Sequence, residues 1–161
     1  MLFRGLPALA FLLPLISAAS AANWSGSYYC SAKAEGGLKF NKITKTWESV
    51  RFKATDNFIL NMRFVSTKPM QDVPNMTLDV YKVSLRSEGS QTELNCFAGG
   101  SGVDVEVTTR GVFSCEQLFF TYKFDMTAAR YLQAYFAGYI DGDNDNNDTP
   151  FMAGGVCTKI N

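Results

Sequence analysis

The chain of 161 residues contains no histidine. Without an imidazole group, neither a Ser-His-Asp triad nor a Cys-His pair can form. No G-x-S-x-G motif occurs, and the glycine-rich tract Gly99–Gly102 precedes a predicted strand instead of a helix, which argues against a phosphate-binding loop. C-x-x-C spacing is absent too, so the usual donors of a structural zinc site are missing.

An excess of charge of either sign is also lacking. The chain has 15 basic and 15 acidic residues, and no polybasic run or patch is visible. We therefore expect no nucleic acid as a partner and no attraction to an anionic membrane surface.

Residues 1–21 have the features of a secretory signal peptide. A short basic start ending at Arg4 precedes an apolar run, Leu6–Ile16, that is too short to span a bilayer comfortably. Ala19-Ser20-Ala21 then supplies a small-x-small cleavage pattern. We predict a signal at 1–21, a single domain at 22–161 with a net charge of about −1, no stable membrane anchor, and a periplasmic or extracellular location. A retained N-terminal anchor is the alternative.

The chain has four cysteines, and all of them follow this segment: Cys30, Cys96, Cys115 and Cys157. An even number of cysteines in a secreted chain indicates two disulfides. Of the three possible pairings we favour Cys96–Cys115, across a local hairpin, and Cys30–Cys157, between the first strand and the last.

Apolar and polar residues alternate with a period of two along most of the chain, which is typical of half-buried strands. Strands are expected at residues 23–32, 47–54, 57–65, 77–87, 92–97, 102–109, 118–125 and 151–160. Turn residues separate them, among them Glu35-Gly36-Gly37 and Thr55-Asp56-Asn57. The pattern predicts an all-β fold, an antiparallel barrel of about eight strands in the lipocalin-like up-and-down style, with a β-sandwich as the alternative.

Residues 127–140 fit either a helix or a strand. Tyr131, Tyr135 and Tyr139 have helical spacing, but they also share one face of a strand. The aromatic content favours a strand entered through a turn at Thr127–Arg130, and the choice stays open at this point.

The segment GYIDGDNDNNDTP, residues 138–150, is the most unusual in the chain. Asp141, Asp143 and Asp145 have a D-x-D-x-D spacing that suits Ca²⁺, and Asp148 offers one more carboxylate. An EF-hand is excluded, because Asn146 and Met152 stand where its Gly and Glu belong. A looser Ca²⁺ loop is one hypothesis, and a polar loop whose Asp and Asn side chains bond their own backbone is the other. No other cofactor is expected.

Aromatic residues are numerous, with 13 Phe, 7 Tyr and 2 Trp, and some of them are candidates for a ligand pocket. The candidate pocket residues are Trp24, Trp47, Tyr131, Tyr135 and Tyr139. Ordinary packing in the core and at the rim of a barrel is the alternative explanation.

Paired carboxylates are the remaining route to catalysis. Asp104 and Glu106 lie on one strand face, and Glu93 or Asp79 is expected across from them. Such a pair can support glycoside hydrolysis at a suitable separation, but one solvated strand face explains the same residues.

The tracts EGGLKFNKITKTW and GYIDGDNDNNDTPFMAGGVCTKI resemble small secreted or periplasmic bacterial proteins of unassigned function. The resemblance implies a periplasmic or extracellular location and nothing about activity. The residues themselves favour a non-catalytic binding or structural module with an unknown small ligand or protein as partner. A hydrolase that uses paired carboxylates or calcium is one alternative, and a secreted inhibitor or effector is another.

Overall fold

The alternating apolar and polar residues form ten antiparallel strands in a single sheet. The structure is a computed structural model, and it describes residues 23–161 except 72, 100, 101 and 103. The strands are β1 (Gly26–Asn41), β2 (Thr46–Phe52), β3 (Phe58–Pro69), β4 (Thr77–Ser87), β5 (Leu94–Cys96), β6 (Val105–Val107), β7 (Val112–Gln117), β8 (Phe120–Asp125), β9 (Arg130–Tyr135) and β10 (Phe151–Lys159). No helix occurs among the described residues, so the predicted all-β class is confirmed.

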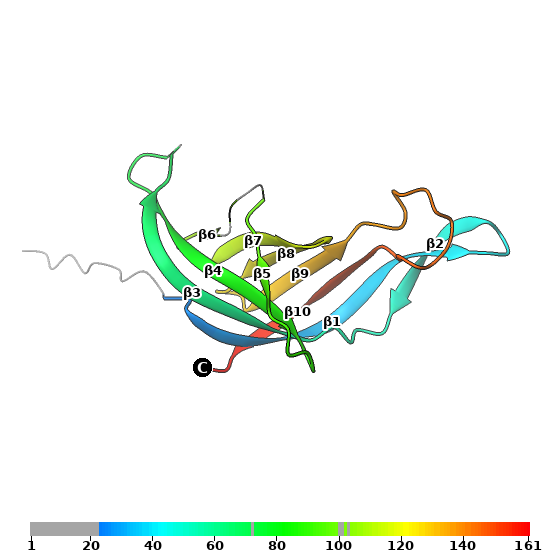
Figure 1. Ribbon diagram of the computed structural model, residues 1–161, viewed down its shortest axis with the longest axis horizontal. Coiled ribbons are helices and arrows are strands. Elements are labelled where there is room, and N and C mark those ends of the chain that lie inside the picture. Colours follow the sequence, from blue (N-terminus) through cyan, green and yellow to red (C-terminus); the bar gives the residue numbers. More distant parts are fainter. Residues whose placement is uncertain (1–22, 72, 100–101, 103) are drawn as a thin grey trace, which may run out of the picture.

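The order of the strands in the sheet is β5-β4-β3-β1-β10-β9-β8-β7. The long strand β1 joins the two halves, because it pairs with β10 along one side and with β3 and then β2 along the other. The sheet bends strongly, so that β3 and β4 face β7 and β8 across the core (Figure 1).

The two ends of this path meet without forming a continuous ladder. Phe97, just after β5, exchanges two backbone hydrogen bonds of 2.8 and 2.7 Å with Glu116 of β7 in an isolated bridge. Cys96 and Cys115 are joined by a disulfide beside it. The sheet is thus an open path fastened at one point, so the barrel stays a prediction, and the sandwich-like alternative fits this arrangement.

The core lies between the facing halves of the sheet. Alternate residues point inward from each strand, as at Phe58, Leu60 and Met62 of β3. Tyr81 of β4 and Phe124 of β8 are the largest fully buried side chains. Burial of a large aromatic or aliphatic side chain contributes roughly 1.5–3 kcal/mol, so this interior is the main source of stability.

Both predicted disulfides are present. Cys30–Cys157 joins β1 to β10 at directly paired positions with a Cα–Cα distance of 4.0 Å, and Cys96–Cys115 spans 5.5 Å. The described residues contain no free cysteine. Two disulfides are consistent with an oxidising compartment.

The strand predictions are confirmed for most of the chain, but β7 was not predicted, and residues 118–119, predicted to begin a strand, form the turn between β7 and β8. One predicted turn is also wrong. Glu35-Gly36-Gly37 lies inside β1, because Gly37 pairs with Phe151 and packs against the Pro150 carbonyl, where a Cβ would lie 2.1 Å from the oxygen. The glycine here permits close backbone approach within a strand.

The open choice at residues 127–140 is resolved in favour of a strand. A tight turn at residues 126–129 connects β8 to β9, and Ala129 has a φ of 53° in it. Strand β9 ends at Tyr135, so Tyr139 belongs to the following loop and not to the strand.

Beyond the curled part, the end of β1 and the whole of β2 form a projecting hairpin, which we call the arm (Figure 1). The loop 136–150 runs beside it. The predicted signal at 1–21 lies outside the described residues. Within the described ranges, no helix is long and apolar enough to cross a membrane.

We expect the replacement of both Cys96 and Cys115 by Ala to lower the free energy of unfolding by about 3 kcal/mol, because the unfolded chain regains the freedom of a 19-residue separation. Urea unfolding of the oxidised wild type and of the variant measures this difference. Equal midpoints would contradict the role of this disulfide in fastening the sheet.

Candidate functional site

A chamber of about 410 Å³ opens at the end of the core where β3 and β8 begin and β4 and β7 end. Its wall combines aromatic, acidic and amide side chains. The lining residues include Asp56, Phe58, Glu88, Leu118, Tyr122 and Gln133.

The pairing of the strands explains why polar side chains reach this end of the core. Glu35 of β1 pairs with Ala153 of β10, Ala153 pairs with Gln133 of β9, and Gln133 pairs with Tyr122 of β8. The four residues therefore form one row across the sheet on its inner face. The small Ala153 leaves space between the longer side chains of Glu35 and Gln133.

Gln133 is the most unusual member of this row. Its side chain is 4% exposed, and it is the one buried polar side chain among the described residues. Its Oε1 atom accepts no hydrogen bond from the described protein groups, and neither does Oε2 of Glu35. Leaving a buried acceptor without a partner costs about 1–3 kcal/mol, so a role beyond packing is indicated.

The loop between β2 and β3 covers part of the chamber. The Tyr131 hydroxyl donates to the Asp56 carbonyl at 3.4 Å, and Asn57 Nδ2 donates to Glu88 Oε2 at 2.8 Å. The Tyr29 hydroxyl donates to the other Glu88 oxygen at 3.0 Å. Glu88 is thus held by two donors, and the loop is tied to β9 and to the end of β4.

Burial and nearby acidic groups shift the ionisation of this region. Burial, followed by repulsion from Asp56, raises the pKa of Glu35, while a hydrogen bond from the Thr55 backbone partly opposes this shift. The pKa of Tyr131 is raised to about 12, mainly by burial and next by the negative charges of Asp56 and Glu35. The pKa of Tyr122 is raised mainly by burial and next by Asp56, so both phenols are neutral at ordinary pH.

An exposed apolar turn stands at the rim of the chamber. Leu118 and Phe119, which connect β7 to β8, are 78% and 73% exposed. Leu118 also has a φ of 53°, a left-handed conformation that is uncommon for a branched side chain. Strain and exposed apolar surface at one position point to a functional use of this rim.

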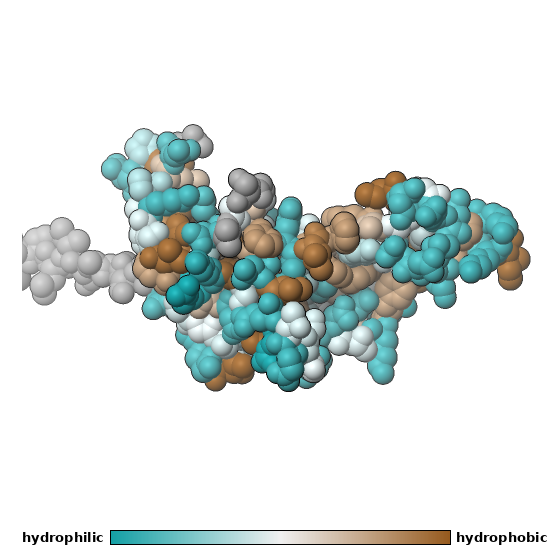
Figure 2. Space-filling model, viewed as in Figure 1, coloured by the Kyte–Doolittle hydropathy of each residue, from teal (hydrophilic) through white to brown (hydrophobic). Residues whose placement is uncertain are grey.

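A larger groove of about 630 Å³ lies on the exposed side of β8, β9 and β10, lined in part by Leu132 and Val156. Neither of the buried oxygens without partners lies in its lining. Exposed apolar side chains elsewhere form separate brown patches on the face drawn in Figure 2, instead of one broad surface. The chamber is therefore the better candidate for a specific site.

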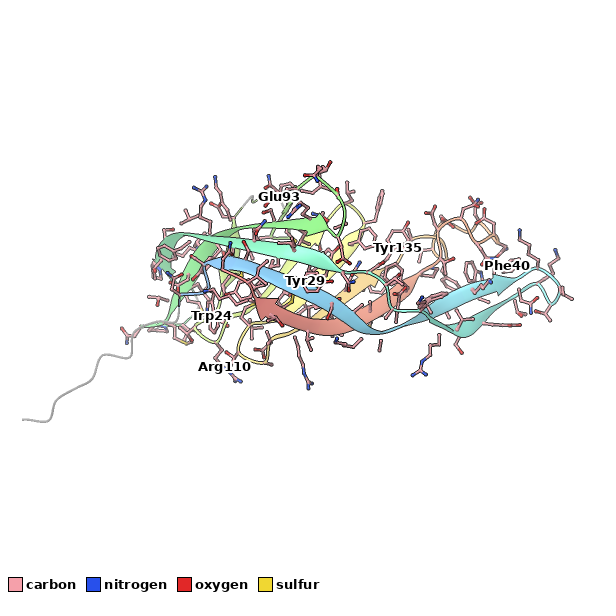
Figure 3. All side chains as sticks on the ribbon, turned by 90° about the horizontal axis from the view of Figure 1, so that it is seen from below. Trp24, Tyr29, Phe40, Glu93, Arg110 and Tyr135 are labelled. Carbon is pink, nitrogen blue, oxygen red and sulfur yellow. A yellow bond between two sulfur atoms is a disulfide. The ribbon has the colours of Figure 1, made fainter. Side chains whose placement is uncertain are left out.

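The five predicted pocket aromatics do not come together. Tyr131 packs against Phe58 of the chamber with ring centroids 4.9 Å apart, and Tyr135 packs against Phe120 of the chamber at 5.0 Å. Trp47 and Tyr139 pack together on the arm, at 5.5 Å. Trp24 lies at the opposite end of the core, where it packs against Gly111. Figure 3 shows Trp24 far from the arm residue Phe40, with Tyr135 between them.

Three of the four aspartates of the predicted Ca²⁺ loop accept hydrogen bonds through their carboxylates. Asp141 accepts from the Asp143 backbone at 2.9 Å, Asp145 accepts from the Asn147 backbone at 2.8 Å, and Asp148 accepts from the Tyr135 hydroxyl at 3.0 Å. No group of three or more His, Cys, Asp or Glu side chains within the described ranges is placed to hold a metal ion. These contacts fit the polar-loop alternative, and Ca²⁺ binding stays a prediction.

Asn146 gives this loop a further structural role. Its side chain accepts from Phe40 N at 2.8 Å and donates to Phe40 O at 3.0 Å, as a neighbouring strand would. The loop is therefore fastened to the arm.

The predicted carboxylate pair is not brought into one cleft. Glu106 pairs with Lys68 at 2.6 Å, and Asp79 accepts from the Thr67 hydroxyl at 2.7 Å. Glu93 accepts from Ser84 and Asn61, and these hydrogen bonds, Ser84 first, lower its pKa. Asp104 is exposed.

Sequence reasoning missed Glu35, Asp56 and Gln133. A signal for Gln133 was available, because it stands between Tyr131 and Tyr135 on the inward face of an apolar strand. Glu35 and Asp56 gave no such signal, since both lie in segments with the composition of turns.

The fold and the chamber define a disulfide-bonded all-β protein with a partly open pocket at one end of its core. Comparison with protein-family models, with curated proteins and with solved structures found no match for this chain.

We predict that Gln133→Met raises the free energy of unfolding by about 1 kcal/mol, because the variant removes a buried acceptor without a partner and keeps most of the volume. The control is Gln117→Met, which loses the 2.9 Å hydrogen bond from Nε2 to Leu94 O and should be destabilised. Chemical unfolding of the three proteins gives the comparison. A loss of stability in Gln133→Met as large as in the control would refute the interpretation.

The raised pKa of Glu35 makes folding stability depend on pH. The folded protein holds this proton more tightly than the unfolded chain, so its contribution is fully present below the ordinary pKa of 4.5 and is lost as the pH rises through the raised value. We therefore expect Glu35→Gln to stabilise the protein more at pH 8 than at pH 4. Thermal melts at both values test this, with Glu116→Gln as a control for the loss of one negative charge. An identical gain at both pH values would contradict it.

Proposed function

We propose that this protein is a non-catalytic, secreted or periplasmic binding module that holds a small ligand in the chamber. The observation that carries the proposal is the buried Gln133 side chain, which lines the chamber and whose Oε1 has no hydrogen-bond partner. A ligand that donates a hydrogen bond to this atom would remove the cost of its burial.

The size and the wall of the chamber support this role. Its volume of about 410 Å³ falls within the range of about 300–1,000 Å³ that is typical of small-molecule sites. Phe58, Phe120 and Leu85 offer apolar surface, and polar side chains such as Asp56, Glu88 and Gln133 make up about half of the wall. Apolar surface beside polar groups at fixed positions suits recognition of one orientation of a small molecule.

Binding is favoured over hydrolysis because the candidate carboxylates have separate partners. Glu106 is paired with Lys68, and Glu93 accepts from Ser84 and Asn61. Neither carboxylate lies in the wall of the chamber.

The proposal includes the predicted barrel, in which β5 and β7 are joined and the sheet encloses the core. The bridge between Phe97 and Glu116 and the adjacent Cys96–Cys115 disulfide fasten β5 to β7, the two strands whose ends contribute Leu94 and Gln117 to the chamber. Secretion or export to the periplasm is part of it as well, because two disulfides form and persist in oxidising compartments.

The test uses N-phenyl-1-naphthylamine, an uncharged aromatic probe whose fluorescence increases in apolar surroundings. We expect the oxidised protein to bind it and Ser87→Trp to lose this binding by at least tenfold, because the indole would fill the mouth of the chamber. Ser87 is exposed and lines the chamber, so the variant should fold.

The matched control is Ser114→Trp, which places the same indole at an exposed position of β7 that does not line the chamber. This variant should bind like the wild type. Absence of binding to the wild type, or equal binding by both tryptophan variants, would refute the chamber as the site.

A further inference from the structure

The charges around the chamber have one sign. Among the described residues, Asp56 and Glu88 are the charged side chains in its wall, and no Lys or Arg lines it. Glu35 lies outside this wall, in the same row of the sheet as Gln133, and its carboxylate, which Asp56 repels, adds negative charge near the chamber. This end of the core therefore favours a cation and disfavours an anion.

The two carboxyl groups in the wall differ in the number of hydrogen bonds that they already accept. Glu88 accepts hydrogen bonds from Tyr29 and Asn57. For the Asp56 carboxylate, the described residues provide no hydrogen bond or ion pair, and Asp56 contacts β9 only through its backbone carbonyl. Asp56 is thus the carboxylate at the mouth that is available to a ligand.

Aromatic rings line the interior behind Asp56. Phe58 and Tyr122 are 5.7 Å apart with an interplanar angle of 71°, and Phe120 lies 6.2 Å from Tyr122. Ring faces attract cations, and they also cover the apolar body of an organic ligand.

The buried amide of Gln133 indicates which kind of cation the chamber prefers. Oε1 of Gln133 is an acceptor, so it favours a ligand that donates an N–H group. A primary or secondary ammonium group has such hydrogens, whereas a quaternary ammonium group has none.

We propose that the chamber binds a small organic amine in its ammonium form, with an aryl or alkyl body against Phe58, Phe120 and Tyr122 and the nitrogen directed to Asp56 and Gln133. This inference rests on the proposed function and adds the chemical class of the ligand. Asp56 provides the charge, and Gln133 distinguishes an N–H donor from other cations.

The experiment compares four ligands with the same phenylbutyl body: 4-phenylbutylamine, 4-phenylbutan-1-ol, 4-phenylbutyrate and trimethyl(4-phenylbutyl)ammonium. Isothermal titration at pH 7 gives the four dissociation constants for the oxidised protein. We expect the amine to bind about tenfold more tightly than the alcohol and the quaternary cation to fall between them. The carboxylate should bind most weakly.

Two variants test which residues cause the preference for the primary amine. Asp56→Asn should remove the advantage of the amine over the alcohol and leave the affinity for the alcohol unchanged, because it removes one charge and keeps the size. The control is Asp104→Asn, which removes an exposed charge elsewhere and should change neither affinity. Gln133→Met should bring the primary and quaternary cations to equal affinity.

The outcomes separate this inference from the proposed function. Binding of all four ligands with equal affinity, lost in Ser87→Trp, would leave the binding module in place and overturn the choice of an amine. An amine preference that persists in Asp56→Asn would also overturn it. Absence of binding of all four ligands and of the naphthylamine probe would overturn both.

Discussion

The junction between β5 and β7 is the constraint on which the rest of the structure depends. A long bent sheet has two end strands, and their unpaired edges must be covered or joined. Here one bridge, between Phe97 and Glu116, and one disulfide, Cys96–Cys115, hold the ends together around the core. The Gln117 side chain adds a 2.9 Å hydrogen bond to the Leu94 carbonyl. Leu94 and Gln117 also line the chamber, so the contacts that join the two ends of the sheet also shape the candidate site.

The chamber end of the core contains groups that reduce stability, whereas the rest of the interior is tightly apolar. Tyr81, Leu60 and Phe124 fill the middle of the core with almost no exposure. Gln133 in the wall and Glu35 in the same row of the sheet each bury an oxygen atom for which the described residues provide no partner, and Leu118 adopts a left-handed backbone at the rim. Natural proteins tolerate such local costs mainly at functional sites, and their grouping at one end is the reason for placing the site there.

Most of the fold could be predicted from the sequence, because the alternation of apolar and polar residues reports directly on strands with one buried face. Particular residues have surroundings that the local sequence pattern does not predict. Gly36 and Gly37 suggested a turn, but they permit β1 to pass close to Pro150 and continue as a strand. Trp47 and Tyr139 were predicted to line a ligand pocket, but they pack against each other where the loop 136–150 meets the arm, and no local sequence pattern indicates this pairing. The position of Glu35 and Gln133 in one row, on either side of Ala153, depends on the pairing of β1, β10 and β9, and β1 lies far along the chain from the other two.

The central claim is that the chamber is a binding site for an organic amine built around Asp56 and Gln133. The most direct measurement is a crystal structure of the oxidised protein grown with 4-phenylbutylamine at pH 7. The account predicts the aryl group against Phe58, Phe120 and Tyr122 and the nitrogen at a hydrogen-bonding distance of about 2.7–3.2 Å from Gln133 Oε1. A chamber that contains only ordered water hydrogen-bonded to Gln133, at a saturating amine concentration, would contradict it.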